Sequence, residues 1–182
     1  EKFVQTDPVL STQMKSVGEV MAIGRTFQES LQKAIRGLET GRDGLNPIFN
    51  EEDEFETLKQ KISIPSPDRL WYVADGFRKG LTVEEIFDYS KIDPWFLVQI
   101  KDLIDDEIEI QKIELPDLSY EELYELKRKG FSDSRIASLT CVSEKEVRRI
   151  RTELEIKPVF KRVDTCAAEF ESSTAYMYST YE

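Results

Sequence analysis

One short pattern recurs along the middle of the chain and constrains its fold more than any other feature. Between residues 26 and 155, a Ser or Thr is followed three residues later by Glu, and apolar residues then recur at helical spacing. In such a capping box, the hydroxyl and the carboxylate each satisfy a free backbone N–H at the start of a helix. The pattern occurs at Thr26/Glu29, Thr82/Glu85, Ser119/Glu122 and Ser143/Glu146. It predicts that this region is built from short amphipathic helices.

Glycine and proline residues divide the same region further, whereas the two ends of the chain have a different character. The helical spacing of apolar residues between these breaks predicts about seven short helices. Residues 1–25 and 158–182 lack that spacing, and the apolar run at 20–23, between Gly18 and Gly24, indicates a short strand. The predicted fold class is therefore an all-α domain with irregular or extended N- and C-terminal arms.

Composition argues against several classes of function. The 182 residues carry a formal net charge of −11 and include no histidine. That charge repels nucleic-acid phosphates and anionic membrane surfaces, and no apolar run approaches the roughly 20 residues of a membrane span. The commonest transition-metal ligand is missing, and Cys141 and Cys166 are too far apart in sequence to form a zinc-binding pair. We expect no nucleic-acid or membrane partner, no metal site, and two free thiols in a reducing cytoplasm.

The sequence holds no complete set of catalytic or cofactor-binding residues. Glycine-rich phosphate-binding motifs do not occur in it. The acidic clusters at residues 51–56 and 102–109 fall on the polar faces of amphipathic helices, which is typical of a solvated surface rather than an acid–base site. The chain also begins at Glu1 rather than Met, and we interpret it as a segment of a longer protein. No catalysis is expected from the segment alone.

One apolar stripe has two interpretations. Phe55, Leu58 and Ile62 follow one another at helical spacing, in a segment set apart by Gly44 and Pro65. Such a stripe is either buried in the core or left uncovered, and an apolar patch flanked by charge is the expected form of a subunit contact. We take these three residues as the candidate self-association surface, with core burial as the alternative.

A second pattern, at residues 130–150, resembles a helix-turn-helix. Its second helix carries Arg148, Arg149 and Arg151, and a DNA-binding protein would place such a helix in the major groove. The alternative is an ordinary helical hairpin whose arginines are solvated or paired with acidic residues. The net negative charge favours the hairpin, and DNA binding remains the rival function.

Several blocks of the sequence closely resemble the large subunit of carbamoyl-phosphate synthase. Four blocks lie toward the ends of the chain, and two short ones lie in its middle. The blocks are residues 10–26 (LSTQMKSVGEVMAIGRT), 28–34 (QESLQKA), 93–99 (DPWFLVQ), 126–131 (LKRKGF), 161–170 (KRVDTCAAEF) and 175–181 (AYMYSTY). The resemblance thus spans nearly the whole chain, and residues 43–66 are the least similar to the family.

The resemblance implies a role inside a larger enzyme. In this family one ATP-grasp half makes carboxyphosphate, which reacts with ammonia from a glutaminase subunit or domain to give carbamate. The other half phosphorylates carbamate, and a helical oligomerisation domain lies between the two. Residues 1–39 would then end the carboxyphosphate synthetase half, residues 40–159 would be the oligomerisation domain, and residues 160–182 would connect to the carbamoyl-phosphate synthetase half.

Further expectations follow from the resemblance alone. The family binds ATP with Mg or Mn outside these residues, so no catalytic, cofactor-binding or metal-binding residue is implied here. The parent would be a cytoplasmic, homo-oligomeric ligase with a glutaminase partner, serving arginine or pyrimidine biosynthesis. Glu19 matches a family position near the carbamate part of an internal tunnel, which protects an unstable intermediate from water. In the family, the hairpin with the three arginines belongs to the helical middle and does not read DNA.

Overall fold

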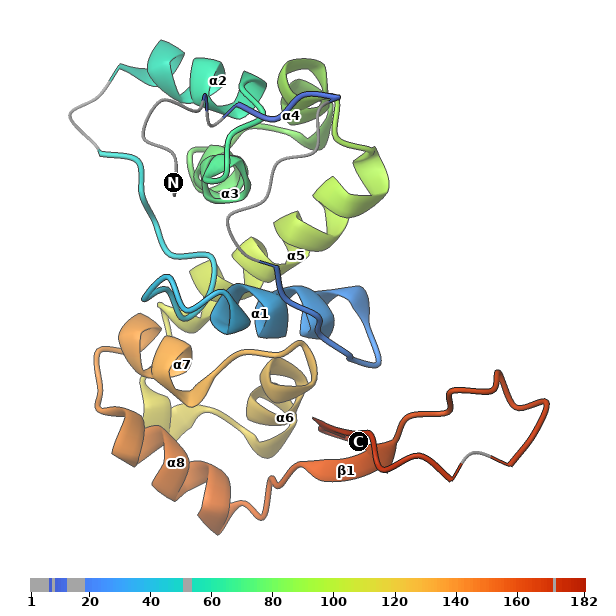
Figure 1. Ribbon diagram of the computed structural model, residues 1–182. Coiled ribbons are helices and arrows are strands. Elements are labelled where there is room, and N and C mark those ends of the chain that lie inside the picture. Colours follow the sequence, from blue (N-terminus) through green and yellow to red (C-terminus); the bar gives the residue numbers. More distant parts are fainter. Residues whose placement is uncertain (1–6, 8, 13–18, 51–53, 172) are drawn as a thin grey trace. The chain divides into compact units, whose positions relative to one another are not determined.

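The computed structural model describes residues 7, 9–12, 19–50, 54–171 and 173–182, and it confirms the all-α prediction. Regular structure in these residues is almost entirely helical, with one short hairpin near the C-terminus (Figure 1). The helices are α1 (Phe27–Gly37), α2 (Phe55–Ser63), α3 (Arg69–Arg78), α4 (Val83–Ser90), α5 (Pro94–Ile110), the 3-10 helix η1 (Leu115–Asp117), α6 (Tyr120–Arg128), α7 (Asp133–Leu139) and α8 (Glu144–Glu153). The strands are β1 (Val159–Arg162) and β2 (Met177–Thr180).

The chain packs as two compact units, and each unit is assembled from two separate stretches of sequence. The first contains Glu1–Val20 and Ile35–Glu109, and the second contains Met21–Ala34 and Ile110–Glu182. The boundaries predicted at residues 39/40 and 159/160 separate parts of a parent enzyme. The packing within this chain does not test them, so they stay predictions.

In the first unit, α2, α3 and α4 pack around a shared apolar core. Ile62 of α2 and Ile86 of α4 are both buried, and Gly76 of α3 lets them come close. A Cβ at position 76 would stand 3.0 Å from Ile62 Cδ1 and 3.1 Å from Ile86 Cδ1. Because contacts this short force the neighbours to shift, a side chain there would push the helices apart.

A buried ionic network ties the loop before α2 to α3 and α5. The Asp75 carboxylate accepts hydrogen bonds from the backbone N–H groups of Ile48 and Phe49, at 2.9 and 2.8 Å. Arg78 donates to Asp75 at 2.7 Å, to Glu107 at 2.6 Å and to the Leu45 carbonyl. Asp75 and Glu107 are nearly inaccessible to solvent, and the Arg78 guanidinium forms an ion pair with each carboxylate.

The second unit holds α6, α7, α8 and the hairpin. Helices α7 and α8 pack against each other, and β1 pairs with β2 in antiparallel register, with Val159 opposite Thr180. The loop that joins the two strands extends away from the helices of this unit (Figure 1). The predicted extended C-terminal arm is therefore a hairpin whose loop joins Arg162 to Met177, with Val159 and Thr180 at its open end.

Two of the four predicted capping boxes close completely. Thr82 Oγ1 accepts from Glu85 N at 3.1 Å while the Glu85 carboxylate accepts from Thr82 N at 2.8 Å. Ser119 and Glu122 make the same exchange at 3.2 and 2.8 Å. Ser132 also caps α7, as its hydroxyl accepts from Arg135 N at 2.9 Å.

The other two boxes close only on the hydroxyl side, because a nearby group competes for the carboxylate. Ser143 Oγ accepts from Glu146 N, but the Glu146 carboxylate pairs with Arg149. Thr26 Oγ1 accepts from Glu29 N at 3.2 Å, but the Glu29 carboxylate turns elsewhere. The full reciprocal box predicted at these two positions is wrong, although the helix starts that it indicates are correct.

The short strand predicted at residues 20–23 is also wrong. Residues 19–24 have no regular secondary structure. Side chains of α1 bond the adjoining backbone groups, since Lys33 Nζ donates to the Ile23 carbonyl and Glu29 accepts from Arg25 N. Polar groups that a strand would have paired with a neighbour are satisfied by the helix instead.

Candidate functional site

Two charged residues of α1, one helical turn apart, form a polar site in the second unit that joins distant segments of the chain. Glu29 and Lys33 pair directly, with Lys33 Nζ 2.7 Å from Glu29 Oε1. The Glu29 side chain is 2% exposed and that of Lys33 23%. We call this pair, with the backbone and hydroxyl groups that it bonds, the α1 node.

Glu29 joins the loop before α1 to strand β2. Its Oε2 accepts from the Arg25 backbone N–H at 2.7 Å and from Thr180 Oγ1 at 3.1 Å. Glu29 and Thr180 each have a relative exposure of 1%. Because the bonds from Lys33 and the Arg25 N–H involve an ionised acceptor, they are of the stronger, charge-assisted class.

Lys33 joins the same two segments. Its ammonium donates to the Ile23 carbonyl at 2.9 Å and to the Ser179 carbonyl at 2.5 Å. It also lies 5.9 Å from the centre of the Tyr178 ring. Each member of the pair therefore holds one group from residues 23–25 and one from residues 179–180.

Close backbone approaches on both sides fix α1 in place. A Cβ at Gly24 would lie 2.8 Å from Ser30 N, and a Cβ at Gly130 would lie 2.9 Å from Glu29 Cα. Gly130 has a φ of +92°, which favours glycine. Gln32 Nε2 adds a hydrogen bond to the Lys129 carbonyl at 3.0 Å.

The sequence analysis missed this site. It assigned Glu29 only to a capping box and gave Lys33 no role. The available signal was an acid and a base at i and i+4 on a helix whose apolar stripe occupies the same turns. The partners in β2 could not be found in this way, because they lie 146 and 151 residues away in the sequence.

The predicted self-association stripe is mostly buried. Leu58 and Ile62 have 0% exposure within this chain, whereas Phe55 is 41% exposed and has Lys59 Nζ 5.2 Å from its ring centre. Helix α2 turns this stripe toward α3 and α4. The expectation of an uncovered stripe is thus met only at Phe55, and a role of the three residues in a subunit contact stays a prediction.

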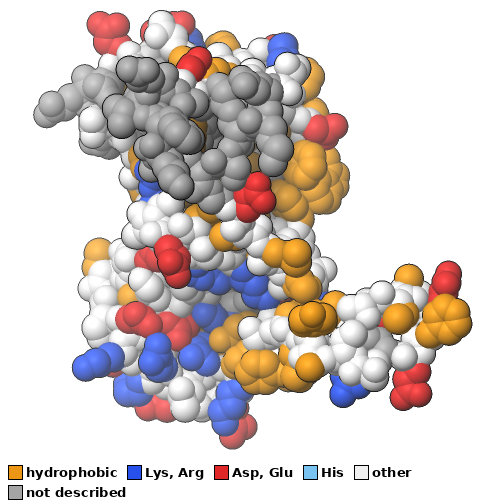
Figure 2. All heavy atoms as spheres, viewed as in Figure 1, with side chains coloured by type: hydrophobic (Ala, Val, Ile, Leu, Met, Phe, Trp, Pro, Cys, Tyr) orange, Lys and Arg blue, Asp and Glu red, His pale blue; other side chains and the backbone are white. Residues whose placement is uncertain are grey.

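A larger exposed apolar group lies at the start of α5, where the sequence analysis proposed nothing. Trp95, Phe96 and Val98 are 55%, 42% and 50% exposed, and the two rings pack edge to face with their centres 5.0 Å apart. Hydrophobic side chains gather over the first turns of α5 in Figure 2. We call these three residues the α5 patch.

Glu19, the predicted tunnel residue, lies in an exposed position with no regular secondary structure. Residues 13–18, which precede it, lie outside the described part of the chain. A tunnel role for Glu19 remains untested.

The three arginines of the rival DNA-binding hypothesis are all paired with acids. Arg149 bonds Glu146 and Glu153 along α8, at 2.7 and 2.6 Å. Arg148 pairs with Glu144 at 2.9 Å, and Arg151 makes a two-bond contact with Asp133. Since these partners already occupy the guanidinium groups on a strongly acidic chain, the structure gives the DNA-binding alternative no support.

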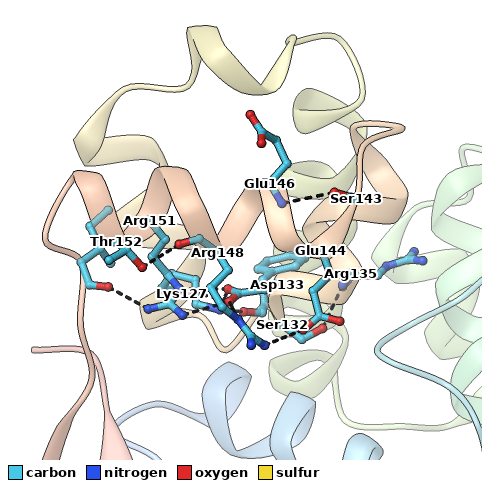
Figure 3. A network of polar contacts seen from close by, with 12 residues as sticks. Lys127, Ser132, Asp133, Arg135, Ser143, Glu144, Glu146, Arg148, Arg151 and Thr152 are labelled. Atoms are coloured by element: carbon cyan, nitrogen blue, oxygen red, sulfur yellow. Dashed lines mark hydrogen bonds and ion pairs between the residues drawn. The ribbon is translucent and has the colours of Figure 1, made fainter.

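Asp133 is the centre of the polar network in Figure 3, which draws side chains from α6, α7 and α8 together. Lys127 Nζ donates to Asp133 at 2.8 Å and to the Phe131 carbonyl at 2.6 Å. Burial would raise the pKa of the Asp133 carboxyl. The charge of Lys127 and the hydrogen bonds from Arg151 and Lys127 outweigh that effect and hold the pKa below its usual value. The network therefore holds the helical hairpin of α7 and α8 against α6.

In the part of the chain that the structure describes, no group of three or more Cys, Asp or Glu side chains could hold a metal ion. Among the described residues, no helix combines the length and the apolar character of a membrane span. The side chains that come together bind one another and stabilise the helices.

The sequence matches one family and many curated relatives. The family model is that of the carbamoyl-phosphate synthetase large chain, oligomerisation domain, and it matches residues 19–155. The carbamoyl phosphate synthase large chains of Pseudomonas syringae pv. tomato, Pasteurella multocida and Neisseria meningitidis serogroup A are 59%, 60% and 57% identical to the chain. These matches cover 100% of this chain and 17% of each relative. The chain belongs to the carbamoyl-phosphate synthetase large-chain family and corresponds to its oligomerisation domain.

Proposed function

We propose that the chain is an internal part of a carbamoyl-phosphate synthase large chain, where it links the two synthetase halves and mediates self-association. The parent would make carbamoyl phosphate from bicarbonate, glutamine-derived ammonia and two ATP, with Mg or Mn. A glutaminase subunit or domain would be its partner in the cytoplasm. Every reacting group would lie outside this segment, whose own role is architectural.

The observation that carries the self-association proposal is the α5 patch in a chain whose family is an oligomerisation domain. Exposed Trp and Phe side chains are the residues most often found at the centre of protein interfaces. The partner that we propose is a second copy of the large chain. Charged side chains follow on the same helix, where Lys101 pairs with Asp105, and they would belong to the polar rim of such a contact.

Phe55 is the second candidate contact. Its neighbours Leu58 and Ile62 support it from within the core and need not touch a partner themselves. Leu58→Glu would therefore bury an unpaired charge, and a change in association would not be separable from unfolding. Phe55→Glu removes the exposed ring and leaves the core intact.

Sedimentation velocity of the full large chain tests the proposal. Trp95→Glu and Phe55→Glu are compared with wild type, and Leu38→Glu serves as control because Leu38 is similarly exposed but lies in neither surface. A contact at the α5 patch predicts that Trp95→Glu weakens association about tenfold or more, while Leu38→Glu leaves it unchanged. An unchanged mass in both the Trp95 and Phe55 variants contradicts the proposed surfaces.

We further propose that Glu19 borders the route taken by carbamate in the parent. The support is its match to a family position and its exposed side chain. Glu19→Ala in the full enzyme is then expected to lower carbamoyl-phosphate formation without a matching fall in bicarbonate-dependent ATP hydrolysis. Equal losses in both rates would contradict this role.

A further inference from the structure

We propose that the α1 node is a positioning device that couples the two synthetase halves, by fixing the segment that enters this domain against the strand that leaves it. The proposal rests on the proposed function, since it takes residues 21–25 and 177–182 as the chain's connections to the two halves. Glu29 and Lys33 are its positioning residues, and neither touches substrate.

The first argument is the way the bonds are shared. Glu29 bonds Arg25 N and Thr180 Oγ1, while Lys33 bonds the carbonyls of Ile23 and Ser179. Each of the two residues thus bonds both the entering segment and the leaving strand. Moving either segment away from α1 therefore breaks one bond of each residue and leaves a buried charge with fewer partners, which is costly.

The second argument is that a rigid frame surrounds the node. Gly24 and Gly130 approach α1 so closely that a Cβ at either position would meet backbone atoms at 2.8 or 2.9 Å. The turn between α6 and α7 thus lies against Glu29 on one side, and the entering loop lies against the start of α1 on the other. A helix held in this way cannot shift to follow one segment without disturbing the other.

The third argument is that the other ion pairs of these segments are exposed to solvent, in contrast to the α1 node. Arg25 lies 3.5 Å from Glu182, and Lys161 lies 2.6 Å from it, but all three side chains are more than 40% exposed. Exposed ion pairs add little to stability. By contrast, the bond from Thr180 to Glu29 is buried, and the bonds from Arg25 N to Glu29 and from Lys33 to the Ser179 carbonyl are partly buried.

A consequence for the reaction follows from the family's two-step chemistry. Carbamate made at one half must reach the other before water destroys it, so product formation depends on how the halves are held. If the entering and leaving segments come apart, ATP consumption at the first half continues while carbamoyl phosphate is lost. The ratio of ATP hydrolysed to carbamoyl phosphate formed is therefore the quantity that the node controls.

The experiment uses the full large chain with its glutaminase partner and four variants. Glu29→Gln removes the charge of the node, and Thr180→Val removes the hydroxyl from β2 while keeping the shape of the side chain. Thr180→Ser keeps the hydroxyl and is the conservative control. Asp133→Asn weakens a network of the same unit that bonds none of the groups held by Glu29 and Lys33, and so reports what general destabilisation does. Its contact with the leaving segment is the Lys127 ammonium, 5.3 Å from the centre of the Tyr181 ring.

Two readouts are compared. Hydrogen exchange of the β2 amides reports local opening, and Glu29→Gln and Thr180→Val are expected to raise it about tenfold, the equivalent of ~1.4 kcal/mol. The ATP hydrolysed per carbamoyl phosphate is expected to rise about twofold or more in these two variants. Both readouts should stay at the wild-type level in Thr180→Ser, and the ratio should do so in Asp133→Asn.

Three results would overturn the proposal. They are an unchanged β2 exchange, a faster exchange with an unchanged ATP ratio, and an equal rise of the ratio in Asp133→Asn. If Glu29→Gln does not fold, Thr180→Val decides the matter alone against Thr180→Ser. The sedimentation result for the α5 patch is independent, so a failure of self-association and a failure of coupling are distinguishable.

Discussion

Thr180 donates a 3.1 Å hydrogen bond to Glu29 although 151 residues separate them in the sequence. Both residues are almost completely buried, and no buried side-chain N or O atom among the described residues lacks a partner. The two ends of the second unit are thus joined by a satisfied polar contact rather than by apolar packing alone. Polar contacts of this kind specify one arrangement, because alternatives leave a charge unpaired.

The close approach at Gly24 gives the first prediction. Gly24→Ala is expected to lower the free energy of unfolding of the chain by about 1–3 kcal/mol, since the new Cβ would stand 2.8 Å from Ser30 N. Urea unfolding followed by circular dichroism measures the change.

Gly37→Ala is the matched control for this substitution. Gly37 is the last residue of α1, and a Cβ there would meet only Val20, at 3.5 Å, an ordinary contact. Alanine favours helix over glycine, so this variant is expected to be neutral or more stable by up to about 1 kcal/mol. Similar losses in both variants would show that the spacing at Gly24 is not the cause.

Capping provides the second prediction. Ser119 takes part in a complete box and its hydroxyl also donates to Glu122 at 2.7 Å, whereas Ser143 makes only one capping bond, at 3.3 Å. Ser119→Ala should therefore cost about 1–2 kcal/mol and Ser143→Ala less than about 1 kcal/mol. Thermal unfolding of the two variants under identical conditions measures the order. The reverse order would contradict the reading of the two caps.

The third prediction is that acid pH weakens the polar network around Asp133, which joins α6 to the helical hairpin of α7 and α8. The folded-state pKa of Asp133 lies below its usual value. The carboxylate therefore contributes stability that is fully present above its unfolded pKa, about 3.9, and is lost as pH falls through the folded pKa. Asp133→Asn should lower the free energy of unfolding at neutral pH by about 2–4 kcal/mol, because Lys127 and Arg151 lose a charged partner.

The pH dependence separates this electrostatic effect from a packing defect. The difference between wild type and Asp133→Asn is expected to shrink as pH falls from about 6 to below about 4. Urea titrations across that range measure the difference. If the difference in the free energy of unfolding stays constant with pH, the charge of Asp133 is not what holds α7 and α8 against α6.

Local patterns in the sequence were sufficient to predict where helices begin, but they were insufficient to predict the α1 node. Thr82 with Glu85 and Ser119 with Glu122 lie within three residues of each other, so their caps depend only on neighbouring groups. Glu146 showed the limit of that reasoning, since Arg149 on the same helix takes its carboxylate. Competition between two local partners cannot be decided from spacing alone.

Contacts between distant segments could not be predicted from the sequence for a related reason. Phe55, Leu58 and Ile62 share one helical face, but whether other helices cover that face depends on how α3 and α4 pack. The exposed Trp95 and Phe96 were likewise not proposed as a surface, because helical spacing does not show which apolar residues other helices leave uncovered. The family resemblance was carried by whole blocks of residues and did not depend on these details.

The buried network of the first unit gives the last prediction. Arg78→Met removes a guanidinium that pairs with both Asp75 and Glu107, and leaves two buried carboxylates without it. Breaking a buried pair in this way costs about 3–5 kcal/mol, so the variant should unfold at much lower urea concentration.

Arg149→Met tests the same chemistry on the surface. Arg149 also pairs with two carboxylates, Glu146 and Glu153, and these hydrogen bonds raise its pKa. All three side chains are largely exposed, however, and water replaces the lost contacts. The free energy of unfolding should hardly change. If the two arginine variants lose equal stability, burial is not what gives Arg78 its importance, and the loop before α2 must be held by its apolar contacts instead.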